Sequence, residues 1–218
     1  MLKKILSRDS NFEDKRRKVI IDKITEDIFV VENFLPIFYE NILEYVFLSN
    51  DILHWEKQEN VAWDDASLSK NKTRIGYAHI MANEKNPFPY PKSEAFHFVF
   101  PMVVSAFDCI GIEIKDFIMS RAFLTEPIYD DAEPTHVDYP HKHWTCLYYP
   151  HTVDGDTNFM QEFYPDIPVD ESKNTNFTMI ASVTPKKGRC VLFNGYRYHN
   201  SYRSKTQKRV VINSNVIV

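Results

Sequence analysis

The sequence is poor in glycine and cysteine, and each scarcity excludes a class of site. Only 5 of the 218 residues are glycine, and no GxGxxG or P-loop pattern occurs, so a glycine-rich phosphate-binding loop is not expected. The three cysteines, Cys109, Cys146 and Cys190, are odd in number and widely spaced. They predict neither a disulfide framework nor a cysteine-based zinc site, and they favour a reducing compartment.

Long apolar runs and an excess of positive charge are also missing. The N-terminal residues Met1 to Lys4 are soon followed by charge at Arg8 and Asp9, without an apolar signal core, and no stretch approaches a membrane span. The net charge of −4 does not indicate a broad nucleic-acid or membrane-binding surface. We therefore expect a cytoplasmic protein with neither nucleic acid nor membrane as a partner.

The first half of the chain carries the helix signals. Residues 1–18 are charged and lack apolar periodicity, which predicts a loose arm. Residues 28–31 are β-branched and aromatic and predict a short strand. Pro36 opens one amphipathic helical pattern, and Ser93 could cap a second that runs through Phe107.

From about residue 112 the pattern changes to short β-rich runs separated by turn signals. This order predicts an α+β, mainly β, domain with its helices on one face of a β-sandwich. We expect one domain over residues 1–218, with helical support and a lid region at 19–111 and the β core at 112–218. The predicted strands of the core are 115–124, 143–149, 157–163, 176–183, 189–194 and 207–218.

The most informative feature is a pair of possible metal ligands, His136 and Asp138, one residue apart. On an extended segment, side chains at i and i+2 point the same way, so they can bind one ion from one side. A distant His199 can complete a facial triad of two imidazoles and one carboxylate. That ligand set leaves coordination positions open and suits non-haem Fe(II), although Mn, Co or Ni could also occupy it.

By itself an HxD triplet is a weak signal, because a hydrogen-bonded loop pair has the same sequence. Its context favours the metal. His199 follows a predicted strand at residues 189–194 and a short turn, and Arg209 then begins a β-branched strand. An arginine at that place can clamp the remote end of a dicarboxylate through a bidentate charge-assisted bond.

With these residues in place, the sequence resembles the Fe(II)/2-oxoglutarate-dependent dioxygenases, in particular their prolyl 4-hydroxylase-like branch. The resemblance covers roughly residues 117–218. Residues 145–149 are similar to the strand that follows HxD, residues 154–159 to the GGETxF turn, and residues 185–193 to the approach to the distal histidine. The resemblance implies a double-stranded β-helix, or jelly roll, which agrees with the predicted strands.

The resemblance also implies roles for individual residues. His136, Asp138 and His199 would bind the iron and form the catalytic centre. Three residues would bind the cosubstrate: Arg209 through the 5-carboxylate of 2-oxoglutarate, Tyr149 through its hydroxyl to the same carboxylate, and Asn213 on the same strand face as Arg209. Collagen-type relatives have lysine in place of Arg209, and several relatives have a tyrosine near Phe123.

The implied activity is oxidative decarboxylation of 2-oxoglutarate to succinate, coupled to hydroxylation of a C–H bond in a prolyl or other side chain of a peptide or protein. It requires Fe(II), 2-oxoglutarate and O2, and ascorbate could keep the iron reduced. Two alternatives stay open. One is a hydroxylase of a small metabolite or free amino acid, and the other is a jelly-roll protein that binds metal without turnover.

Other residues near the triad have several interpretations. His141 and His143 have the spacing of a second metal pair but are more typical of loop residues that line a substrate opening. Arg203 is interpreted as a surface residue or a substrate contact. By analogy with the family, residues 56–75 and 125–134 are candidate lid segments.

Overall fold

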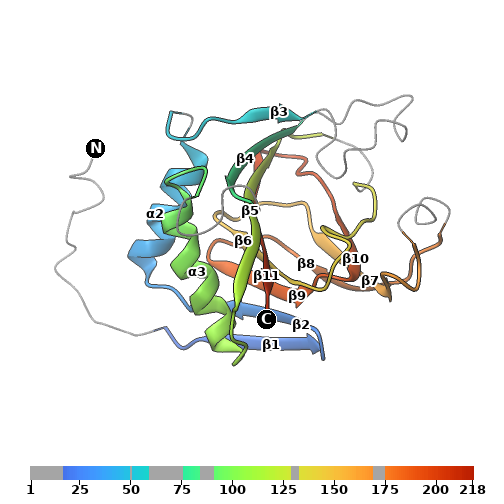
Figure 1. The fold of residues 1–218 in the computed structure, drawn as a ribbon. Coiled ribbons are helices and arrows are strands. Elements are labelled where there is room, and N and C mark those ends of the chain that lie inside the picture. The colour runs from blue at the N-terminus through green and yellow to red at the C-terminus, as the bar shows by residue number, and fades with distance from the viewer. Residues whose placement is uncertain (1–16, 50, 59–75, 84–90, 129–132, 169–174) are drawn as a thin grey trace.

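The computed structural model describes most of the chain, and two antiparallel sheets with two helices make up its body (Figure 1). Residues 1–16 of the predicted arm at 1–18 and most of the predicted lid at 56–75 lie outside the described residues. No helix in the described part is long and apolar enough to cross a membrane. The described residues are 17–49, 51–58, 76–83, 91–128, 133–168 and 175–218.

The larger sheet has eight strands and the smaller has three, and together they form the predicted jelly roll. All strand pairs are antiparallel. The larger sheet has the order β1 (Ile20–Thr25), β2 (Ile28–Glu32), β9 (Arg189–Asn194), β6 (Trp144–Tyr149), β11 (Arg209–Ile217), β5 (Asp116–Thr125), β4 (Gly76–Ala82) and β3 (Glu56–Gln58). The smaller has the order β10 (Arg197–Ser201), β7 (Thr157–Phe163) and β8 (Met179–Val183).

The two helices, α2 (Ile37–Leu48) and α3 (Phe96–Cys109), lie on the outer face of the larger sheet (Figure 1). Pro36 begins α2 as predicted, because its fixed φ of −58° suits the residue before a first turn. Ser93 does not cap α3 itself. Its hydroxyl accepts the Ala95 N–H at 3.3 Å, so it closes the turn before the helix, which begins three residues later than Ser93.

Strand alternation gives the larger sheet one apolar face and one functional face. On β11, Val210 and Ile212 point outward into a core with Phe47 of α2 and Phe107 of α3. The residues between them on the strand point inward toward the smaller sheet. There a second core of Leu147, Val191 and Phe193 packs against Phe159 and Val183.

The N-terminal half contributes more β-structure than predicted. Four strands, β1 to β4, come from before residue 112; β2 was predicted at residues 28–31, and the other three are additions to the predicted helical support and lid region at 19–111. β1 was missed because it is an exposed edge strand without apolar alternation. β10 was missed because its sequence, RYHNS, is polar and yet almost entirely buried.

A buried histidine fixes the start of β6. His143 is 1% exposed, and its Nδ1 lies 2.6 Å from the His141 carbonyl oxygen. Its ring packs directly on Gly195 in the turn between β9 and β10, where a Cβ would lie 2.0 Å from Nε2. His143 is therefore a packing residue that requires glycine opposite it, rather than the metal ligand or the residue at a substrate opening considered from sequence.

This contact predicts a coupled pair of substitutions. Gly195→Ala should lower the free energy of unfolding by about 1–3 kcal/mol, because the new methyl group overlaps a buried ring. In a His143→Ala background the same methyl group should cost at least about 1 kcal/mol less, because the ring is gone. Urea unfolding of the four proteins in this double-mutant cycle measures the coupling. An equal cost of the methyl group in both backgrounds would contradict the packing role.

Candidate metal and dicarboxylate site

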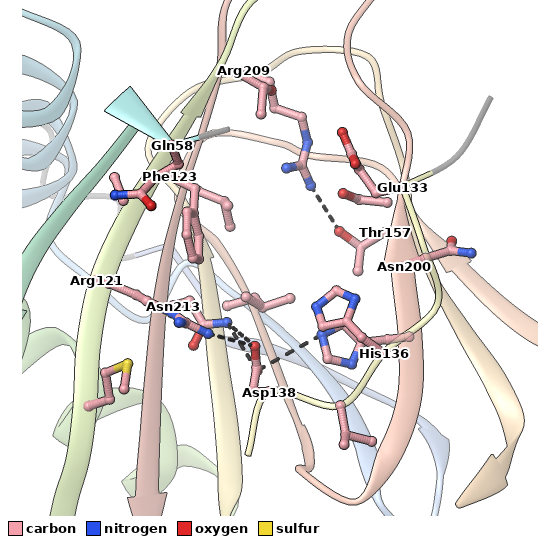
Figure 2. A pocket seen from close by; sticks show the side chains of 18 of the residues that line it. Gln58, Arg121, Phe123, Glu133, His136, Asp138, Thr157, Asn200, Arg209 and Asn213 are labelled. Carbon is pink, nitrogen blue, oxygen red and sulfur yellow. Dashed lines mark hydrogen bonds and ion pairs between the residues drawn. The ribbon is translucent and has the colours of Figure 1, made fainter. Parts of the chain in front are cut away.

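Three predicted ligands from two distant segments meet between the sheets. His136 lies on an extended segment that forms a two-way backbone bridge with His199 of β10, with both N···O distances 2.9 Å. The possible ligand atoms of His136, Asp138 and His199 all lie within 4.8 Å of one another. Figure 2 shows His136 and Asp138 at one end of a cavity, which all three residues line. Among the described residues, this is the group of three that could hold a metal ion.

Both imidazoles are oriented for metal binding through Nε2. The Nδ1 atom of His136 lies 2.9 Å from the Pro134 carbonyl oxygen, and that of His199 lies 3.2 Å from the Arg197 carbonyl oxygen. Because a carbonyl only accepts hydrogen bonds, each Nδ1 carries the proton and each Nε2 presents a lone pair.

The Asp138 carboxylate is enclosed by hydrogen-bond donors from three strands. Arg121 of β5 donates at 3.2 Å and Thr145 of β6 at 3.2 Å. From β11, Asn213 donates to the two oxygens at 3.1 and 3.0 Å, and Asn215 donates at 3.1 Å. The carboxylate is thus held in one orientation before any metal binds.

The same surroundings set the protonation of the triad. Burial alone would raise the pKa of Asp138, but the nearby His199, Arg121 and His136 and the Asn213 hydrogen bond hold that pKa far below its ordinary value. Burial and the neighbouring His136 lower the pKa of His199 to about 4. At neutral pH the site therefore offers a carboxylate and a neutral imidazole, which are the forms that bind a metal.

Arg209, the predicted dicarboxylate clamp, is buried at the other end of the cavity. Its Nε donates to the Gly155 carbonyl oxygen at 3.0 Å, and its Nη2 donates to Thr157 Oγ1 at 3.0 Å (Figure 2). Gly155 has φ +99°, and a Cβ there would lie 2.7 Å from the Tyr202 carbonyl oxygen. Glycine is therefore required to bring this carbonyl to the guanidinium.

Two predicted cosubstrate residues lie somewhat differently from expectation. The Tyr149 hydroxyl donates to Thr157 Oγ1 at 2.8 Å, so it reaches the Arg209 end of the cavity through Thr157. Asn213 lines the cavity, and its amide donates to Asp138. Thr157 was not singled out from sequence, although it lies in the 154–159 turn that resembles the family motif.

The triad and Arg209 line one cavity of about 510 Å³. Glu133, which sequence reasoning missed, also lines it and forms a buried ion pair with Arg203. Arg203 is 6% exposed, so the interpretation as a surface residue is wrong. A volume of this size is typical of a site for a small ligand.

Burial of histidines predicts a pH dependence of stability. Desolvation lowers the pKa of His143, His151 and His199 below the ordinary value of 6.5. The stability that they contribute is present above pH 6.5, where neither state is protonated. It is lost as the pH falls, because the unfolded chain then binds protons that the folded chain excludes.

Metal-free protein should therefore unfold at a lower urea concentration at pH 5.5 than at pH 7.5. Its free energy of unfolding should fall by about 1.4 kcal/mol per pH unit for each histidine that stays neutral in the folded state. His151, whose Nε2 accepts the Val210 N–H at 3.1 Å, offers a variant outside the triad. His151→Gln should flatten the pH dependence, whereas His97→Gln on the exposed side of α3 should not. Equal stability at both pH values would show that these histidines do not remain neutral.

Comparison with known proteins gives the fold independently. No protein-family model matches the chain, and no curated protein matches it. A Trichoplax adhaerens prolyl hydroxylase in complex with a hypoxia-inducible-factor peptide is 16% identical, with a TM-score of 0.54 over 88% of this chain and 84% of its own. A Pseudomonas putida prolyl-4-hydroxylase is 11% identical, with a TM-score of 0.51 over 88% and 92%.

Enzymes that act on small molecules share the likeness. SnoK, a non-haem α-ketoglutarate-dependent carbocyclase from nogalamycin biosynthesis, is 10% identical, with a TM-score of 0.59 over 87% of this chain and 79% of its own. These likenesses confirm the predicted jelly roll. The chain has the double-stranded β-helix fold of the 2-oxoglutarate–Fe(II) oxygenases.

Proposed function

We propose that the protein is an Fe(II)- and 2-oxoglutarate-dependent oxygenase that hydroxylates a C–H bond. The observation that carries this proposal is the placement of a two-histidine, one-carboxylate triad and a buried arginine at opposite ends of one cavity. Arg209 and Asn213 are four residues apart on β11, which is about 13 Å of extended chain. A short dicarboxylate can bridge that space from the arginine side chain to an ion at the triad.

Each residue has a defined part in the proposal. His136, Asp138 and His199 would hold the iron and leave coordination positions free, and the bound iron would supply the oxidative decarboxylation of 2-oxoglutarate by O2. Arg209 and Thr157 would bind the remote carboxylate. The hydrogen bonds of Arg209 in the described residues go to a carbonyl and a hydroxyl, both neutral, so a carboxylate ligand would supply its countercharge.

The proposed substrate is a prolyl or other side chain of a peptide or protein. A small metabolite is the alternative, and a specific observation favours it: structures with the same fold include the epimerase SnoN in complex with a nogalamycin compound. The peptide complex of the Trichoplax adhaerens enzyme supports a peptide or protein substrate. The cavity itself accommodates either an inserted side chain or a free molecule.

The test is anaerobic addition of Fe(II) and 2-oxoglutarate to metal-free protein. A visible metal-to-ligand charge-transfer band, followed by succinate when O2 is admitted with ascorbate, would support the proposal. A band without succinate under any substrate would instead support a metal-binding protein without turnover. Failure to form the band while iron is bound would contradict the dicarboxylate site.

Substitutions separate the two ends of the site. His136→Ala and Asp138→Ala should abolish the band and reduce iron affinity by at least about tenfold, because each removes a ligand. Arg209→Gln should keep the iron but raise the Kd for 2-oxoglutarate by about 10- to 100-fold, because it removes a charge-assisted bond. His97→Ala is the matched histidine control, being half exposed on α3. If a variant at either end of the site bound iron and 2-oxoglutarate as the wild-type protein does, the role assigned to its residue would be refuted.

A further inference from the structure

Arg121 is a second arginine in the cavity, and beyond its hydrogen bond to Asp138 the proposed reaction gives it no part. It lies on β5 opposite Asn213 of β11, at the level of the triad and not at the level of Arg209, which pairs with Thr125. Its guanidinium carbon lies 4.8 Å from the centre of the Phe123 ring, which holds it against the cavity wall. Figure 2 shows it on the side of Asp138 away from His136.

The hydrogen-bonding capacity of Arg121 is largely unused. One of its five N–H groups goes to Asp138, through Nη2 at 3.2 Å. Its Nε is buried and has no hydrogen-bond partner among the described residues. The side chain is still 24% exposed, and it lines the cavity. A ligand that enters the cavity can therefore reach this guanidinium.

The cavity continues past the level of the triad, on the side away from Arg209. Its lining includes Met119, two residues beyond Arg121 on β5, and Pro140, two residues beyond Asp138. Ile80 of β4, opposite Arg121 in the sheet, adds to an apolar wall there. This part of the cavity combines one cation with aliphatic surface, which suits an acid with a hydrocarbon portion.

The charges that line the cavity favour the same class of ligand. Divalent iron would offset the two negative charges of bound 2-oxoglutarate. Asp138 offsets one of the lining arginines, and Glu133 is already offset by its ion pair with Arg203. With iron and 2-oxoglutarate bound, the lining residues and their ion-pair partners then carry one net positive charge, and a second anion would offset it.

We propose that Arg121 binds a carboxylate of the primary substrate, so that the oxygenase acts on a carboxylate-bearing compound with an apolar portion. This inference rests on the proposed function, because the substrate site is defined relative to bound iron and 2-oxoglutarate. The carboxylate can belong to a free acid or to an acidic side chain of a peptide. Arg121 would act as a specificity-determining residue, held in place by Phe123 and Asp138.

The experiment uses full-length protein with Fe(II) and 2-oxoglutarate, and paired acid and amide probes. The pairs that represent free acids are hexanoate with hexanamide, N-acetyl-L-proline with its amide, and N-acetyl-L-leucine with its amide. Blocked Ala-Asp-Ala and Ala-Asn-Ala peptides test the acidic side chain of a peptide as the source of the carboxylate. Two measurements are made on each. One is the anaerobic charge-transfer band and its perturbation by the probe, and the other is probe-stimulated succinate formation.

In wild-type protein at least one acid should perturb the band and stimulate succinate about tenfold more than its amide. Stimulation by free acids or by the aspartate peptide identifies the source of the carboxylate. In Arg121→Gln, Thr145, Asn213 and Asn215 still donate to Asp138, so the 2-oxoglutarate band should still form. The acid preference should fall by about tenfold or more, and Arg121→Lys should retain part of it. Lys57→Gln, which removes an exposed charge from β3, should behave as wild type.

The contradicting results are distinct from those of the proposed function. No band in the wild-type protein would remove the proposed function and this inference together. A normal band with equal responses to acids and amides, or no response to any acid, would overturn the inference alone. Loss of the band in Arg121→Gln and in Arg121→Lys would also overturn it, because Arg121 would then serve the metal or cosubstrate.

Discussion

The hydrogen bonds around the Asp138 carboxylate are the interaction on which the site depends. Four side chains of β5, β6 and β11 donate to it, so an irregular segment is fixed to the inner face of the larger sheet. Two residues earlier, His136 is joined by its backbone to β10 of the smaller sheet. The triad is therefore assembled where one short segment contacts both sheets, and its geometry follows from the distance between them.

The alternation of side chains along its strands gives the larger sheet both an apolar face for the core and a polar face for the cavity. Ala122 and Leu124 of β5 and Val210 and Ile212 of β11 point into the apolar core beneath the helices, and the residues that alternate with them point into the cavity. The apolar half fixes the register, since a shift by one residue would bury polar side chains under the helices. That register places Arg209 next to Thr125 and Asn213 next to Arg121. The two arginines consequently occupy separate levels of the cavity.

The sequence predicted the features that depend on short-range pattern. The i, i+2 spacing of His136 and Asp138 and the alternation of the later strands depend only on local geometry, and the structure has both. The relation of His199 to the pair came from order along the chain and family likeness. The polar, buried strand β10 was missed because its burial comes from the facing sheet and not from its own composition.

The contacts of the site were harder to predict because they join distant residues. The Thr157 hydroxyl contacts both Tyr149 and Arg209, and nothing in their spacing indicates it. Asn213 was correctly predicted to lie on the same strand face as Arg209. Its amide nevertheless meets the Asp138 carboxylate, because β11 places it opposite the segment that carries Asp138. The orientation of each imidazole by a backbone carbonyl is likewise a tertiary property.

The most direct test of this account is a crystal structure of the protein with Mn(II) and 2-oxoglutarate, grown without oxygen. The account predicts one metal bound by His136, Asp138 and His199, with the remote carboxylate of 2-oxoglutarate on Arg209 and Thr157. A metal bound elsewhere, or a dicarboxylate that does not contact Arg209, would contradict it.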